Sequence, residues 1–256
     1  MKTTNYTTIG SMTSLLFAAL LLTSSASAQT AEEIVKKMDE NMTFNTRTGN
    51  ATLEVVRAGQ ATDTRTLRLW GRGFDDSYSE FLTPARDQGV KYLKIAKSLH
   101  MYLPRTEKVM TISGHLLRES IMDSDFSYED MLEARALLAD YDAKLLGSET
   151  FNGEDCWLLE LTAKREGVSY YRRKLWISKK TYVAMKMERY AETGLLLKTM
   201  TARDIKVHGG RNYPMVLEMQ DAMRKGSKTT FTMSNVVFDV AIPESTFSRR
   251  NLMKGN

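Results

Sequence analysis

The side chains that could perform acid–base or metal chemistry are few, and their spacing matches no common catalytic pattern. The three histidines are His100, His115 and His208. None begins an H-E-x-x-H pattern and no two lie four residues apart, which argues against a zinc hydrolase. No G-x-S-x-G sequence occurs, which disfavours a serine hydrolase with a strand-to-helix nucleophile. We therefore predict no catalytic residues, no metal site and no cofactor.

Acidic side chains are densest in one short segment, which contains Asp123, Asp125, Glu129 and Asp130. A calcium-binding loop that started at Asp123 would need glycine at its sixth position and glutamate at its twelfth. This chain has Tyr128 and Ala134 there. The simpler interpretation is a helix N-terminus, which is stabilised by capping and by negative charge.

The overall charge does not favour nucleic acid as a partner. The chain has 36 Lys and Arg residues against 31 Asp and Glu, which gives a formal net charge of +5. The only dense basic run is Tyr170-Tyr171-Arg172-Arg173-Lys174. We interpret this run as the solvated face of a strand with one aromatic side chain buried; a patch that meets anionic head groups or an acidic partner is the alternative. We expect no binding of nucleic acid.

The N-terminal segment has the pattern of an export signal. Lys2 is the only charged residue before Glu32, and an apolar stretch over 9–22 precedes Ala26-Ser27-Ala28. This stretch is too short to span a bilayer as a helix, and a small-x-small sequence is typical of a cleavage site. We predict a signal peptide over residues 1–28, cut after Ala28; an uncleaved membrane anchor is the alternative. The single Cys156 of the exported chain is expected to be a buried apolar residue.

Two segments have helical periodicity. Over 31–42, Ile34, Met38 and Met42 fall on one helix face, and Thr30 is a possible N-cap. A second helix is predicted over 127–139, where Ser127 begins a sequence resembling a capping box. Both predicted helices are amphipathic, so each has an apolar face to bury.

The rest of the chain alternates in polarity or contains turn residues. Clean alternation is found over 64–70, 183–188 and 215–220, and Asn152-Gly153 is the sharpest hairpin signal. About ten strands with short connections predict an antiparallel meander in one domain, residues 29–256. A sheet of this size must curl. The two helices would then cover its concave face, and the 16 methionines of the chain suit an adaptable apolar interior.

The middle of the chain resembles a known family. The sequence x-P-x-x-x-x-G at 83–89, Met101-Tyr102-Leu103-Pro104 and Ser124-Asp125-Phe126-Ser127-Tyr128-Glu129-Asp130 occur in this order. This order resembles that of the outer-membrane lipoprotein-sorting proteins, which are relatives of the periplasmic carrier LolA. The resemblance extends over most of the chain after residue 28. We find no counterpart of the arginine that contacts the lid in LolA, so the cargo need not be a lipoprotein.

The resemblance implies a mainly β fold with some α structure: an incomplete, half-open antiparallel β-barrel covered by amphipathic helices. It also implies a periplasmic carrier, which is not an enzyme, that transfers lipid or lipoprotein acyl chains to the outer membrane. We expect a monomer. From strand alternation we predict that the apolar cavity is lined by Leu67, Leu69, Met101, Leu103, Val183, Met185, Met187, Met215, Leu217 and Met219. We predict that the lid carries Phe126, Tyr128, Met131 and Leu132.

Two other functions stay open at this point. The first is an accessory or adaptor subunit of an RND-type exporter in the inner membrane, with an interior filled by the protein's own side chains. The second is a hydrolase that depends on the three histidines. A structure distinguishes the first from a carrier by what fills the space between sheet and helices.

Overall fold

The computed structural model describes residues 1–4, 29–132, 136–166 and 168–254. The prediction of a signal peptide concerns mainly residues 5–28, which lie outside the described residues. Within the described part of the chain, none of the helices combines the length and the apolar composition that crossing a membrane requires.

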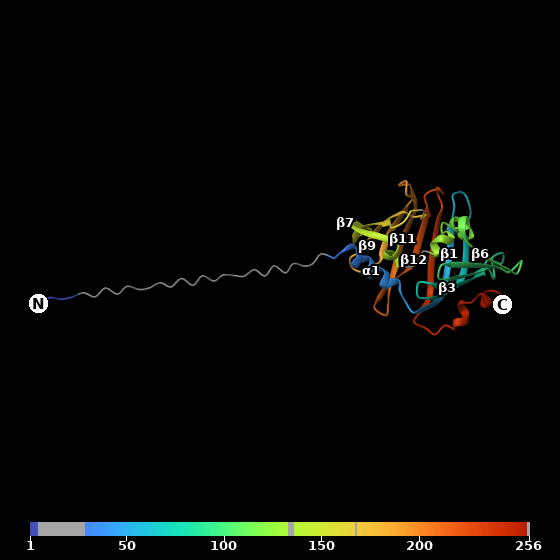
Figure 1. Ribbon diagram of the computed structural model, residues 1–256, viewed down its shortest axis with the longest axis horizontal. Coiled ribbons are helices and arrows are strands. Elements are labelled where there is room, and N and C mark those ends of the chain that lie inside the picture. Colours follow the sequence, from blue (N-terminus) through green and yellow to red (C-terminus); the bar gives the residue numbers. More distant parts are fainter. Residues whose placement is uncertain (5–28, 133–135, 167, 255–256) are drawn as a thin grey trace.

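The described chain is dominated by one antiparallel sheet of thirteen strands (Figure 1). The strands cover Thr46–Val56 (β1), Asp63–Arg72 (β2), Asp76–Thr83 (β3), Lys91–Ile95 (β4), Ser98–Leu103 (β5), Lys108–Ile112 (β6), Tyr141–Phe151 (β7), Glu154–Ala163 (β8), Arg172–Ser178 (β9), Ala184–Tyr190 (β10), Leu196–His208 (β11), Arg211–Asp221 (β12) and Lys228–Phe238 (β13). The sheet is open, and the predicted mainly β, antiparallel fold is confirmed.

The sheet has two halves that meet at one strand pair. β1–β6 form one half in chain order and β7–β13 form the other, and the pairing of β1 with β13 joins them. β6 and β7 therefore end the strand order at opposite sides. The connection between these two strands, residues 113–140, has to cross from one half of the molecule to the other (Figure 1).

The count exceeds the predicted ten because some strands are buried on both faces and show no alternation. In β4 four consecutive residues, Lys91 to Lys94, are buried. The outer face of β3–β5 is covered by the C-terminal segment, which contains Glu244–Phe247 (η4, a 3-10 helix) and Arg249–Leu252 (α3). Phe247 and Leu252 pack there against the sheet. A strand covered on both sides does not have the period-two pattern of a half-buried strand.

The first helix is placed as predicted. α1 covers Ala31–Met42, and Thr30 and Glu33 form a complete capping box at its start. Ile34 and Val35 are fully buried. Together with Met38 they pack against apolar residues of β7–β10 in a cluster that we call the helix cluster. α1 thus covers the inner face of the half of the sheet that contains β7–β10.

Near the end of α1 lies a carboxylate, that of Asp39, whose charged form is disfavoured by burial. This gives a first prediction. Burial raises the pKa of Asp39 to about 6, although the backbone N–H of Leu137 donates to its carboxylate at 3.2 Å. The folded protein therefore binds a proton that the unfolded chain lacks between about pH 6 and pH 4, and the charged carboxylate costs stability above pH 6. We expect Asp39→Asn to raise the melting temperature by about 2–4 °C at pH 7.5. The gain should vanish at pH 4; an equal gain at both values would contradict this account.

The second predicted helix, over 127–139, is α-helical at its start and 3-10 helical over its last residues, and two short 3-10 helices precede it. The connection contains Gly114–Arg118 (η1), Ile121–Asp123 (η2), Tyr128–Leu132 (α2) and Leu137–Ala139 (η3), of which only α2 is α-helical. Residues 133–135 lie outside the described residues. We call residues 113–132 the lid.

Candidate functional site

The lid contributes apolar side chains to the inner face of the sheet. The four predicted lid residues, Phe126, Tyr128, Met131 and Leu132, are partly buried and pack against a cluster of apolar residues, mostly from β1–β6, β12 and β13, that we call the lid cluster. The Tyr128 hydroxyl lies 3.4 Å from the Tyr92 hydroxyl and 3.8 Å from the Met101 sulfur. The rings of Phe126 and Phe231 meet edge to face at 6.4 Å. The lid and the sheet are therefore in direct contact.

Half of the predicted lining residues lie in or against the lid cluster: Leu67 and Met215 are members of it, and Leu69, Met101 and Leu103 pack against it. Leu217 and Met219 lie on the same face of β12 as Met215, because alternate residues of a strand share a face. The structure thus brings half of the predicted lining residues together under the lid, and two more lie on the same face of the sheet. That they contact a ligand stays a prediction.

The three candidates in and just before β10 are placed differently. Met187 belongs to the helix cluster under α1. Val183 and Met185 are members of neither cluster. Met185 lies where the pairing of β9 with β10 shifts register between Ala184 and Lys186, so alternation read from the sequence does not continue through it.

A buried carboxylate fixes the lid to the other half of the sheet. Asp130 accepts from Arg189 Nη1 at 2.5 Å and from Lys198 Nζ at 2.6 Å. The Tyr170 hydroxyl donates to it at 2.9 Å, and the backbone N–H and the hydroxyl of Ser127 donate at 2.7 and 2.9 Å. Burial alone would raise the pKa of Asp130, but the two cations lower it to about 2. The carboxylate is therefore charged at neutral pH, and it links α2 to β10 and β11.

The cations around Asp130 belong to a row across three strands. Arg189 pairs with Arg173 of β9 on one side and with Lys198 of β11 on the other. Arg173 is buried and donates to the Tyr141 hydroxyl at 2.9 Å. The interpretation of 170–174 as a solvated face is therefore wrong for Arg173, which lies beneath the connection between β6 and β7.

The spacing of these cations from apolar residues in the sequence indicates that they are buried. Arg173 is two residues from Leu175, and Arg189 is two residues from Met187, so alternation puts each arginine on the same face as a core residue. The sequence also did not let us place a counterpart of the arginine that contacts the lid in LolA; in this structure Arg189 contacts the lid through Asp130. The capping interpretation of Asp130 was correct for Ser127 but did not include these long-range partners.

Asp125 makes a second attachment of the lid. Its side chain accepts from the hydroxyls of Thr229 at 2.6 Å and Ser227 at 3.0 Å. The backbone N–H of Asp125 donates to the same Thr229 hydroxyl at 2.8 Å, and the residue is 1 % exposed. The start of the lid helix is thus held at two places in the β7–β13 half of the sheet, by β13 next to the seam and by β10 and β11 farther from it.

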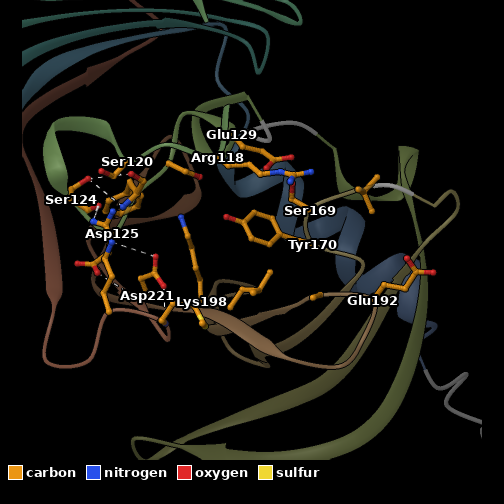
Figure 2. Close-up of a pocket in the computed structure, with 17 residues that line it drawn as sticks. Arg118, Ser120, Ser124, Asp125, Glu129, Ser169, Tyr170, Glu192, Lys198 and Asp221 are labelled. Atoms are coloured by element: carbon orange, nitrogen blue, oxygen red, sulfur yellow. Dashed lines mark hydrogen bonds and ion pairs between the residues drawn. The ribbon is translucent and has the colours of Figure 1, made fainter. Parts of the chain in front are cut away.

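A cavity of about 400 Å³ lies beside these two attachments (Figure 2). Its wall contains Arg118, Ser120, Ser124, Asp125, Phe126, Ser127, Glu129, Val168, Ser169, Tyr170, Ala191, Glu192, Leu197, Lys198, Asp221, Met223 and Arg224. Among the described residues of this wall, Phe126 is the only one that was predicted as a lid or lining residue. The predicted apolar space between lid and sheet is, in this structure, filled where the lid side chains meet the sheet.

The histidines lie on separate elements. His100 of β5 is buried, with Nδ1 3.1 Å from the Thr111 hydroxyl; burial lowers its pKa, and the charge of Arg249 lowers it further. His115 is in η1, and His208 ends β11. Among the described residues no three His, Cys, Asp or Glu side chains are arranged to hold a metal ion. Cys156 is fully buried in β8, as expected.

Comparison with solved structures defines the class of fold. The chain is similar to a DUF1329 family protein from Desulfovibrio piger (27% identity, TM-score 0.80, covering 87% of this chain and 97% of that one). It is also similar to a putative outer membrane lipoprotein-sorting protein domain from Vibrio parahaemolyticus (24% identity, TM-score 0.78, covering 88% of this chain and 98% of that one). The chain is similar as well to a LolA superfamily protein from Nitrosomonas europaea (24% identity, TM-score 0.73, covering 88% of this chain and 100% of that one). The fold is LolA-like, as the sequence resemblance indicated.

The sequence itself matches a family model over residues 73–254, which is most of the chain. The protein belongs to that family, whose description is "-like: Uncharacterized protein". No curated protein matches the chain.

Proposed function

We propose that the protein is a carrier that binds acyl chains of a lipid or lipoprotein between the sheet and the lid. The LolA-like fold supports a carrier-type role. The observation that carries the proposal is the packing of the lid side chains on the lid cluster, which puts apolar groups of a separate segment where a ligand would lie. Loading would exchange lid-to-sheet contacts for ligand-to-sheet contacts.

The energies involved make this exchange feasible. Burial of one methylene contributes about 0.8 kcal/mol, so a sixteen-carbon chain gains on the order of 10 kcal/mol when it leaves water. The ligand needs no polar contact for this gain. Opening the lid also requires that the polar attachments of Asp130 and Asp125 break, which adds to the cost of separating the apolar side chains. The chain would take its ligand across the periplasm to the outer membrane, after cleavage of the signal peptide behind Ala28.

A charge introduced under the lid tests the proposal. We expect Met101→Glu to weaken the binding of a fluorescent fatty-acid analogue at least tenfold, because the new carboxylate would lie beside Tyr128 where the acyl chain would pack. Met253→Glu is the matched control, since Met253 is 57% exposed near the C-terminus. Absence of probe binding by the unaltered protein, with no lipid co-purifying from the cell envelope by native mass spectrometry, would contradict a carrier function.

One observation favours a second candidate, an accessory subunit of an RND-type exporter. The lid side chains already fill the inner face of the sheet, as an adaptor without cargo would require. This candidate predicts no acyl binding by the unaltered protein and co-purification with an inner-membrane exporter. The same probe measurement therefore distinguishes the two functions.

A further inference from the structure

The cavity beside the lid has polar groups that the fold does not use. Among the described residues, the side chains of Arg118, Ser120 and Ser169 make no hydrogen bond or ion pair, although all three lie on the cavity wall. Figure 2 shows Arg118, Ser169 and Lys198 on the border of one space. A guanidinium, an ammonium and hydroxyl groups are the donors that phosphate oxygens accept from.

The carboxylates of the same wall are mostly occupied. Asp125 is bound by Thr229 and Ser227. Asp221 accepts from the backbone N–H of Met223 at 2.9 Å. Glu192 is exposed on the turn between β10 and β11, at the outer end of the cavity in Figure 2. Glu129 lies beside Arg118 at the lid side of the cavity in Figure 2 and has an interaction of its own. The free donors are therefore at the lid side of the cavity, and the free carboxylate, that of Glu192, is at its outer side.

The cavity is connected to the proposed acyl-chain site by two side chains. Phe126 lies on the cavity wall and also packs in the lid cluster. Lys198 lies on the wall and is bound, at 2.6 Å, to the carboxylate that fixes α2. An anion that entered the cavity would meet the cation on which the closed position of the lid depends.

We propose that this cavity binds the phosphate of an anionic lipid head group, with Arg118 and Lys198 as its cations. The inference rests on the proposed carrier function, because the head group enters with acyl chains that lie under the lid. The phosphate replaces Asp130 as the partner of Lys198, which weakens the attachment of α2 and allows the chains to displace the lid. Cargo with a phosphate thus opens the lid more readily than uncharged cargo does.

The test compares three competitors that displace a bound fluorescent fatty-acid analogue from the full-length mature protein: a diacyl phosphatidic acid, the diacylglycerol with the same chains, and glycerol 3-phosphate. We expect phosphatidic acid to displace the probe at a concentration at least tenfold lower than diacylglycerol does. In Arg118→Ala this ratio should fall toward one. Arg118 is exposed and has no partner among the described residues, so the variant should fold. In the control Arg105→Ala, which alters an exposed arginine of the turn between β5 and β6, the ratio should persist.

Each other outcome has a separate meaning. Equal displacement by the two lipids overturns the head-group site and leaves the carrier function standing. Displacement by glycerol 3-phosphate as effective as that by phosphatidic acid assigns the cavity to a free phosphate ester and overturns the lipid proposal. Absence of displacement by every lipid contradicts the carrier function itself. Persistence of the preference in Arg118→Ala overturns the assignment of Arg118.

Discussion

Replacement of Asp130 by asparagine is expected to destabilise the protein by about 3 kcal/mol, because it leaves Arg189 and Lys198 buried without their shared charged partner. For a chain of this size the melting temperature should fall by roughly 6–12 °C. The loss should begin locally. Backbone amides of the lid, residues 120–132, should exchange with solvent faster than those of the central strands, because Asp130 attaches the lid and not the sheet itself.

The effect of Asp130 should depend on pH in a defined direction. The pKa of Asp130 in the folded protein is about 2, below its ordinary value of 3.8, so its contribution to stability is complete above about pH 4 and is lost as the pH falls toward 2. The difference between the unaltered protein and Asp130→Asn should shrink over this range.

The matched control is Asp142→Asn. Its carboxylate is 79% exposed and 3.9 Å from Lys164 Nζ, and such surface pairs contribute about 0–1 kcal/mol. Thermal unfolding and hydrogen exchange of both variants check the prediction. Equal destabilisation by the two substitutions would show that the buried contacts of Asp130 stabilise the protein no more than an exposed ion pair does.

Truncation of the lid at Tyr128 should have opposite effects on stability and on ligand affinity. Tyr128→Ala removes the contacts with Tyr92 and Met101, which lowers the melting temperature by a few degrees. If acyl chains displace the lid, the same loss makes opening easier. A reduction of about 1 kcal/mol in the cost of opening raises the affinity for the fatty-acid analogue about fivefold.

A second truncation separates this effect from general loosening of the protein. Phe247 packs on the outer face of the sheet, away from the lid, and is 6% exposed. Phe247→Ala should lower the melting temperature at least as much and leave the affinity unchanged. Weaker probe binding by Tyr128→Ala would mean that Tyr128 holds the ligand, and that the lid does not compete with it.

The sequence predicted the parts of this molecule that depend on local pattern. The α1 helix follows from its capping box and its apolar face, and β2, β10 and β12 follow from their alternation. β4 could not be found in this way, because its outer face is buried by a segment about 150 residues later in the chain, around η4 and α3.

The site was less accessible to sequence reasoning, because its contacts are long-range. Asp130 is separated from Arg189 by 59 positions and from Lys198 by 68. Local pattern shows that Asp130 begins a helix, but it does not show which strands lie beneath that helix. The alternation of Arg189 with Met187 could have indicated a buried arginine. The lid residues were predictable because an apolar run after a helix start must pack on some surface.

The seam between β1 and β13 has a consequence for how the protein is made. The second strand partner of β1 is the last strand of the chain, with Leu53 opposite Phe231. Translation proceeds from the N-terminus, so β1 must wait for nearly the entire polypeptide before this pairing can close. Contacts between residues so distant in sequence slow folding and leave strand edges exposed meanwhile. We expect the newly synthesised chain to depend on holding chaperones more than a helical protein of equal length does.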